Sequence, residues 1–273
     1  KSPVYYRAFL FLTRALIIKN RGATLSEILS DIISDKAAVK IRSAATVLIM
    51  RQAQAGMEIL MLRRNAKLVF AGGAWVFPGG AVDQADSEDV GLEHEELAAR
   101  VAAVRESAEE CGLLLEPQQL VHFSHWTTPV NQKRRFATWF FAAHVAEKNS
   151  AVVIDDGEIH DYQWLTPAQA LAQHRAGELT MMPPTYLSIK MVDQFISADQ
   201  ALESLRRFEA YWITPRISRD GETMVLLYPG DAGYEASDGA LSGPRHRCVM
   251  NDLGVSYIHS GKDVGIAAMD NPQ

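Results

Sequence analysis

The central part of the chain alternates between apolar runs of strand length and segments with helical spacing. Residues 44–50 and 58–62 are apolar runs joined by the turn 52–56, a pattern that predicts a β-hairpin. Residues 135–145 are apolar on both faces, as expected of a buried central strand, and residues 160–165 form another strand-length run. Strands that alternate with helices in this way predict an α/β fold.

Helical spacing and capping residues predict four helices in and after this region. They are a segment from about Glu95 to Cys111 closed by Gly112, a capping-box helix from Thr166 to Gly177, a helix capped by Thr185, and a helix started by Ser197. The acidic stretch from Asp83 to Glu96 is predicted to be a loop.

Residues outside this central part are interpreted as additions. Residues 1–40 contain an amphipathic stripe from Leu25 to Ile33, which predicts an N-terminal helical extension. Residues 191–273 combine a helix with short β-like runs separated by Gly, Asp and Pro, which predicts a β-rich C-terminal extension packed on the core. The domain itself is expected to span residues 41–190.

Composition narrows the classes of protein that these elements can build. The chain has 273 residues, of which 48% are hydrophobic and 22% charged, values typical of a globular protein with a large core. A net charge of −6 gives no global field that attracts nucleic acid, and no apolar run near the start reaches the roughly 18 residues of a membrane span. Two cysteines are too few for a disulfide framework, so a reducing cytoplasm is the expected location.

The predicted helix around residues 95–111 carries the candidate chemistry. At about 100° per residue, Glu106, Glu109 and Glu110 share one narrow sector of the helix surface. Apolar residues fall on the other side: Leu97, Val101, Val104 and Ala108. We therefore predict that the acidic face lies opposite the buried face.

Three carboxylates at this spacing repel one another, and a divalent cation would relieve the repulsion. Mg²⁺ takes oxygen ligands and typically bridges carboxylates to the phosphates of a substrate. The acidic face therefore suits a metal-dependent phosphate enzyme. A solvated acidic helix face is the alternative.

The residues around this helix resemble the Nudix box, G-x5-E-x7-R-E-U-x-E-E-x-G-U, in which U is apolar. Its defining positions are occupied by Gly80, Arg105, Glu106, Glu109, Glu110, Gly112 and Leu113. The sequence departs from the pattern at Asp86, which replaces the first Glu, and at Ser107, which replaces an apolar residue. In addition, 18 residues separate Asp86 from Arg105 where the family has seven, which we interpret as an 11-residue insertion.

The resemblance implies an α/β/α sandwich with a mixed sheet. It also implies an enzyme that hydrolyses the diphosphate bond in a nucleoside diphosphate linked to another group. It implies Mg²⁺ or Mn²⁺ as cofactor, with Glu106, Glu109 and Glu110 as metal ligands. Arg105 would hold the loop of the motif by pairing with Asp86 or a neighbouring carboxylate. A surface pair between Arg105 and Glu109 is the alternative.

A further carboxylate in this family often lies some 40 to 50 residues beyond the Glu pair, just before a Trp-x-x-Pro segment. Glu158 is the candidate here, Asp156 is the second choice, and a simple acidic turn is the alternative. Glu158 or Glu106 would orient or deprotonate the attacking water.

The candidate substrate-binding residues are two glycines and two arginines. Gly79 and Gly80 let the backbone approach a ligand closely. Arg64 follows the second strand and Arg135 stands where the central strand begins; arginine matches phosphate oxygens in a bidentate way. For Arg135, an arginine that merely flanks a strand is the alternative.

Within the family, the chain is most similar to the long branch of coenzyme A diphosphatase relatives that includes a peroxisomal mammalian member. The similarity rests on FAGGAWVFPGG, SHWTTP, RRFATWFF and MMPPTYLSI. The shorter coenzyme A enzymes carry an Arg where this chain has Val69. The expected partner is thus a small diphosphate such as coenzyme A or acyl-coenzyme A, with no nucleic acid and no stable membrane span, and a homodimer is one option for the N-terminal segment. A Nudix enzyme for ADP-ribose, NADH or dinucleoside polyphosphates and a non-catalytic binding module are the alternatives.

Overall fold

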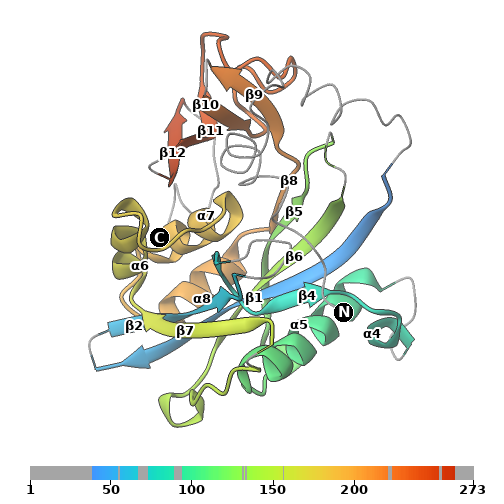
Figure 1. The fold of residues 1–273 in the computed structure, drawn as a ribbon, viewed down its shortest axis with the longest axis vertical. Coiled ribbons are helices and arrows are strands. Elements are labelled where there is room, and N and C mark those ends of the chain that lie inside the picture. Colours follow the sequence, from blue (N-terminus) through green and yellow to red (C-terminus); the bar gives the residue numbers. More distant parts are fainter. Residues whose placement is uncertain are drawn as a thin grey trace.

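A mixed eight-stranded β-sheet forms the centre of the protein (Figure 1). The computed structural model describes residues 39–54, 56–66, 73–88, 94–130, 132, 134–155, 157–220, 223–251 and 254–261. The strands of this sheet are β1 (Ile41–Ala53), β2 (Gly56–Arg64), β3 (Trp75–Val76), β4 (Gly79–Ala81), β5 (Val121–Thr127), β6 (Arg135–His144), β7 (Ile159–Leu165) and β8 (Tyr211–Ile213). Their order is β3-β2-β1-β6-β5-β8, with β4 paired to β1 and β7 paired to β2.

Strand β1 has two partners on the same edge, and the change of partner positions the candidate site. Its first half pairs with β4, where Ala45 faces Gly80, and its last residues form the predicted hairpin with β2. On its other edge β1 runs parallel to β6 along the whole length of β6. The sheet therefore opens between β4 and β2, and β6 is the buried central strand that the sequence predicts.

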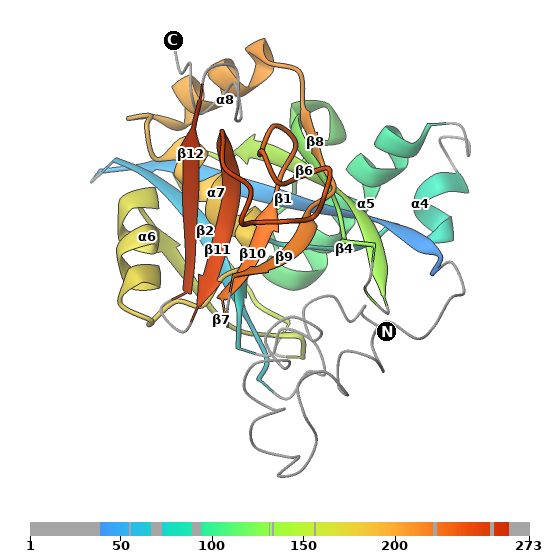
Figure 2. The same cartoon turned by 90° about the horizontal axis from the view of Figure 1, so that it is seen from above.

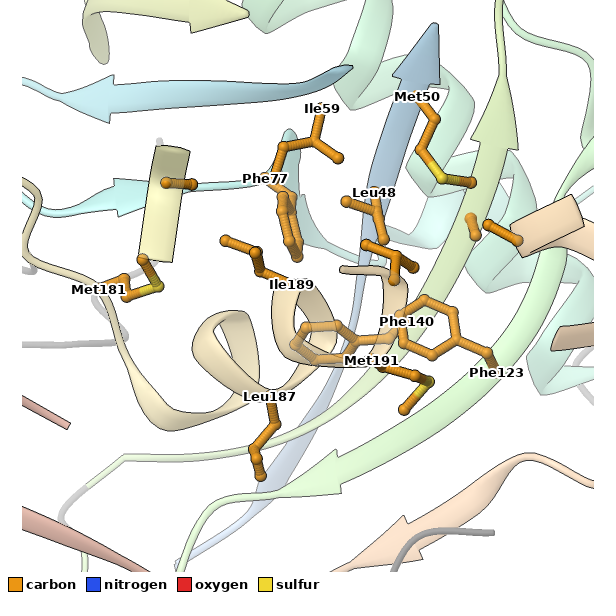
Figure 3. Packing of buried hydrophobic residues seen from close by; sticks show 14 of the residues in the cluster. Leu48, Met50, Ile59, Phe77, Phe123, Phe140, Met181, Leu187, Ile189 and Met191 are labelled. Atoms are coloured by element: carbon orange, nitrogen blue, oxygen red, sulfur yellow. The ribbon is translucent and has the colours of Figure 1, made fainter. Parts of the chain in front are cut away.

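Helices cover both faces of the sheet. They are α4 (Gln84–Glu88), α5 (Glu95–Cys111), α6 (Pro167–Arg175), α7 (Pro183–Val192) and α8 (Ala198–Arg207), with single helical turns at Pro117–Gln119 and Glu147–Asn149. Because side chains alternate along a strand, Val47 and Ile49 pack with α5 whereas Leu48 and Met50 pack with the α6, α7 and α8 side. Figure 3 shows the second of these two cores, in which Phe140 of the sheet lies close to Met191 of α7.

A separate antiparallel sheet follows the main one in the chain (Figure 2). Its strands are β9 (Arg216–Asp220), β10 (Thr223–Leu227), β11 (Arg245–Asn251) and β12 (Gly254–Ser260). Leu226, Cys248 and Val255 from this sheet belong to the same apolar core as α7. The imidazole of His174 in α6 accepts a hydrogen bond from the backbone N–H of Val255 (2.9 Å), which ties the second sheet to the first.

The structure confirms an α/β fold with a mixed sheet and a β-rich C-terminal region. The predicted N-terminal helix lies outside the described residues, and the division at residues 40 and 190 stays a prediction. Among the described helices, none is both long enough and apolar enough to cross a membrane.

Two helix predictions are corrected by the structure. The stretch predicted as a loop contains α4, whose start is held by a hydrogen bond from the Asp83 N–H to the Asp86 carboxylate (2.8 Å). Helix α7 begins at Pro183 rather than after Thr185, which is buried inside the helix. Proline fits the first turn of a helix because the N–H that it lacks would be unpaired there.

Candidate active site

Helix α5 presents small residues to the sheet. Ala99, Ala102 and Ala103 are fully buried, whereas Leu97 is 46% exposed and Val101 is only partly buried. The predicted arrangement of this helix is therefore wrong, because its buried face carries alanines and continues directly into Glu106 and Glu110. Alanine side chains let the helix lie close to the sheet, and this closeness places the two carboxylates against β4.

Two glycines of β4 receive these carboxylates. The Gly79 N–H donates a hydrogen bond to Oε2 of Glu110 (2.9 Å). A Cβ atom at Gly80 would lie 2.1 Å from Oε1 of Glu106, far inside van der Waals contact. Glycine at position 80 is thus required by the position of Glu106, and glycine at position 79 is required by β1, because a Cβ there would collide with Ala45 and Thr46.

Arg105 connects α5 to β4 and to α4. Its guanidinium forms two hydrogen bonds with Asp86 (3.0 and 2.9 Å) and donates a third to the carbonyl oxygen of Ala81 (3.1 Å). The predicted pair with Asp86 is confirmed, and Asp86 is almost fully buried. Arg105 also reaches Glu106 (3.0 Å) and Glu109 (3.1 Å), so the surface pair with Glu109 forms as well.

Glu158 approaches the same site from the segment before β7. Its Oε2 lies 3.4 Å from Nη2 of Arg64, at the end of β2. Arg64 is 8% exposed, and its Nε has no hydrogen-bond partner among the described residues. The structure therefore brings Arg64 and Glu158 together, and Arg64 is a buried cation that keeps a free N–H donor among the described residues.

The electrostatics of the site reflect crowded, partly buried carboxylates. Burial raises the pKa of Glu110 to about 8; the Gly79 N–H opposes this change, and the charges of Glu106 and Glu158 reinforce it. Burial likewise raises the pKa of Glu106, against the opposing effect of Arg105. The hydrogen bond to Asp86, opposed in part by burial, raises the pKa of Arg105 above its usual range. Negative charge is therefore costly here, and a bound cation would lower that cost.

The carboxylates have the chemistry of a divalent-cation site, but they are not gathered into a finished coordination shell. Within the described residues, no group of three His, Cys, Asp or Glu side chains is arranged to hold a metal ion. Arg105 holds Glu106 and Glu109, and the latter side chain is 60% exposed. An ion would need Glu109 to exchange Arg105 for the metal, which its exposed position permits. The metal-ligand assignment stays a prediction.

Comparison with known proteins identifies the family. A model of the NUDIX domain matches residues 40–183, which include β1, α5 and the Arg105–Asp86 pair. The chain belongs to the Nudix hydrolase family. A Caenorhabditis elegans protein named as a nudix hydrolase is 25% identical and covers 71% of this chain and 74% of its own.

Two further comparisons support this assignment. The human protein named "Acyl-coenzyme A diphosphatase NUDT19" is 26% identical, and the match covers 67% of this chain and 74% of the human one. A crystal structure of a NUDIX hydrolase from Alicyclobacillus acidocaldarius has a TM-score of 0.54 at 25% identity, covering 61% of this chain and 97% of that one. The Nudix fold is thus shared over nearly the whole of that structure.

Both departures from the Nudix box have a structural explanation. Asp86 retains the carboxylate that binds Arg105 and lies on the short helix α4, just before the insertion. Ser107 is fully buried, and its hydroxyl donates a hydrogen bond to the carbonyl oxygen of Ala103 (2.8 Å). A polar side chain is therefore accommodated at an apolar position of the Nudix helix because the helix backbone satisfies it.

One predicted substrate-binding residue of this Nudix domain does not join the site. Arg135 donates from Nε to the carbonyl oxygen of Thr128 (3.1 Å), and its register partner is Ile41, four residues before Ala45. Four residues along a strand and two strands across correspond to about 16 Å between the Cα atoms of Arg135 and Gly80. The structure therefore favours the alternative, an arginine that flanks its strand, and Asp156 lies outside the described residues.

Two residues outside the predicted site set shape this part of the Nudix domain: Asn65, which no sequence pattern indicates, and Asp155, which belongs to the acidic group before β7 and fits the alternative of an acidic turn. Asn65 and Asp155 both hold the segment that carries Glu158 through hydrogen bonds to its backbone. A signal for Asp155 was present, since Asp followed two residues later by Gly is typical of a turn in which the side chain bonds the backbone. The contribution of Asn65 depends on a contact with residues far away in the sequence and leaves no local pattern.

Proposed function

We propose that this Nudix hydrolase cleaves the diphosphate bond of a nucleoside diphosphate linked to a second group, with coenzyme A or acyl-coenzyme A as substrate. The observation that carries the proposal is the convergence of Glu106, Glu110 and Glu158 beside a glycine pair and the buried Arg64. Three carboxylates and one guanidinium in so small a space suit a diphosphate substrate that binds together with a divalent cation.

Glu106, Glu109 and Glu110 are the residues that would hold Mg²⁺ or Mn²⁺. When bound, the metal would neutralise charge on the diphosphate oxygens and lower the pKa of a coordinated water. The Gly79 N–H holds the Glu110 carboxylate. Arg105 holds the Glu106 carboxylate, and glycine at position 80 leaves the space that this carboxylate occupies. Arg105 positions these carboxylates, since its guanidinium donates hydrogen bonds to Glu106, Glu109 and Asp86.

Glu158 is proposed as the general base. Its side chain is 29% exposed, so water reaches it, whereas that of Glu106 is 12% exposed and already bound to Arg105. The water oxygen would bond to one phosphorus, its proton would pass to Glu158, and the bridging P–O bond would break. The products are two monophosphates.

Arg64 is proposed to bind a phosphate oxygen of the substrate. Its contact with Glu158 is long at 3.4 Å, and its Nε is unpaired among the described residues. A guanidinium in this state can turn its donors toward a phosphate without losing a strong existing bond. Gly79 and Gly80 would act through the carboxylates that they accommodate, because the Gly79 N–H binds Glu110 and the Cβ position of Gly80 faces Glu106.

The choice of coenzyme A rests on the resemblance in sequence to proteins named as acyl-coenzyme A diphosphatases, at 26% identity for the human one. ADP-ribose, NADH and dinucleoside polyphosphates are the alternative substrates, and a non-catalytic binding module is the alternative function. The complete set of site carboxylates and the buried Arg64 favour chemistry over binding alone.

Substrate profiling tests this proposal. Phosphate release, after coupling to a phosphatase, would be measured with coenzyme A, acetyl-coenzyme A, ADP-ribose, NADH and diadenosine polyphosphates, with Mg²⁺, with Mn²⁺ and with EDTA. We expect metal-dependent cleavage with a kcat/KM for the coenzyme A compounds at least about tenfold above the others. Preference for ADP-ribose or NADH would overturn the substrate, and Mn²⁺ binding without any cleavage would point to the binding module.

A further inference from the structure

We propose that Asp155 is a positioning residue for Glu158: its carboxylate fixes the turn that directs Glu158 at Arg64 and the carboxylates of α5. This inference rests on the proposed function and adds to it a residue outside the Nudix box.

Both oxygens of the Asp155 carboxylate are used by the backbone of the turn. Oδ2 accepts a hydrogen bond from the Glu158 N–H (2.9 Å) and Oδ1 accepts one from the Ile159 N–H (2.9 Å). A Cβ at Gly157 would come within 3.0 Å of Oδ2, so glycine leaves room for this arrangement. Asp155 therefore binds two consecutive backbone N–H groups and determines where residue 158 leaves the turn.

A second set of contacts holds the turn from the side of β2. The Asn65 N–H donates to the carbonyl oxygen of Glu158 (2.8 Å), and the Asn65 side chain donates to that of Gly157 (3.2 Å). Just beyond, the β2–β7 register shifts between Arg63 and Arg64, as at a β-bulge. Bulges redirect side chains and are common beside active sites.

The result of these restraints is the direction of one side chain. The Glu158 carboxylate points to Arg64, and its charge contributes to the raised pKa values of both Glu106 and Glu110. Asp155 and Glu158, three residues apart, thus have different roles: among the described residues the first bonds backbone N–H groups of the turn, and the second faces the site. Because Asp155 is exposed, its hydrogen bonds contribute little to global stability, which lets a functional effect be separated from a structural one.

A double-mutant cycle tests the inference with wild type, Asp155→Ala, Glu158→Gln and the double variant. We expect Asp155→Ala to lower kcat about 10- to 100-fold, the range seen when residues that orient a reactive group are lost, while KM changes less than about threefold. In the Glu158→Gln background the same change should cost less than about twofold, because the group that it positions is already inactive. Independent, multiplicative losses in the double variant would overturn the proposal.

Two further readouts separate a positioning role from a merely structural one. Amide hydrogen exchange at Glu158 and Ile159 should speed up in Asp155→Ala, while Mn²⁺ affinity should stay within about threefold of wild type, since Asp155 is no ligand. The matched control is Asp161→Ala: Asp161 lies on β7 and accepts a hydrogen bond from the Tyr162 N–H (2.8 Å), and in the described part of the chain its side chain bonds no residue of the site. Its loss should leave kcat unchanged.

The outcomes distinguish this inference from the proposed function. Wild-type cleavage that is insensitive to Asp155→Ala, or to Glu158→Gln, overturns the positioning role and leaves the diphosphatase proposal in place. A wild type that cleaves none of the diphosphates overturns both.

Discussion

Replacing Glu110 by Gln is expected to reduce turnover by at least about 100-fold without destabilising the fold. Glutamine keeps an oxygen that can accept the hydrogen bond from the Gly79 N–H, so the packing of α5 on β4 is preserved. It removes a buried carboxyl group that is costly to ionise: burial and the charges of two acidic neighbours raise its pKa to about 8, against the opposing effects of the Gly79 N–H and Arg64. The melting temperature in EDTA should therefore equal or exceed that of wild type. Turnover should fall further than the 10- to 100-fold typical when a residue that hydrogen-bonds to a metal ligand is replaced, because Glu110 would itself be a ligand.

To test this expectation, turnover, Mn²⁺ affinity and melting temperature are measured on the same samples of wild type and Glu110→Gln. Glu95→Gln is the matched control, because Glu95 lies in the first turn of the same helix and is exposed. It should retain wild-type turnover and Mn²⁺ affinity. Turnover of Glu110→Gln within about threefold of wild type would contradict the role given to Glu110.

Gly80→Ala is expected to impair catalysis much more than stability. The added methyl group would collide with the Glu106 carboxylate, whose atoms lie at 2.1, 2.5 and 2.9 Å from the Cβ position. This carboxylate is the flexible end of a side chain, so the fold can adapt by moving it. A displacement of about 1 Å at a reacting centre costs on the order of 100-fold in rate, and we expect a loss of about 10- to 100-fold in kcat with a melting temperature within about 3 °C of wild type.

Gly177→Ala is the matched control for that variant and should show the reverse behaviour. Gly177 has a φ of 77° after α6, and a Cβ there would meet nothing within 4 Å. Alanine in this left-handed conformation costs about 1 kcal/mol or more, which corresponds to roughly 2–4 °C in melting temperature for a chain of this size class. Its turnover should be unchanged. If Gly80→Ala kept wild-type kcat, Glu106 would not need its observed position.

Local patterns predicted the elements whose ends are determined by nearby residues. The capping box of Thr166 and Gln169 forms as expected, Ser197 caps α8, and Gly112 closes α5 in the left-handed conformation. The Arg105–Asp86 pair was also predictable, because a carboxylate at that place in the motif has an obvious cationic partner.

Features that depend on how elements meet in space were not predictable from the sequence. The helical periodicity of α5 predicted that its large apolar residues face the core. In the structure α5 lies close to β4, and this short distance requires alanines on its buried face. Arg64 could be proposed as a phosphate ligand, yet its burial beside Glu158, 94 residues away in the sequence, depends on the pairing of β2 with β7. For Arg135 the type of side chain was suggestive, but its position in the sheet separates it from the carboxylates.

Metal-dependent diphosphatase activity is tested most simply by ³¹P NMR of coenzyme A incubated with the wild-type protein and Mg²⁺. Cleavage of the diphosphate bond predicts that the two diphosphate resonances disappear and that two new monophosphate resonances replace them, and that EDTA stops the reaction. Unchanged diphosphate signals in every substrate of the panel, release of inorganic phosphate without a phosphatase, or the same rate in EDTA would contradict a metal-dependent diphosphatase built on Glu106, Glu109 and Glu110.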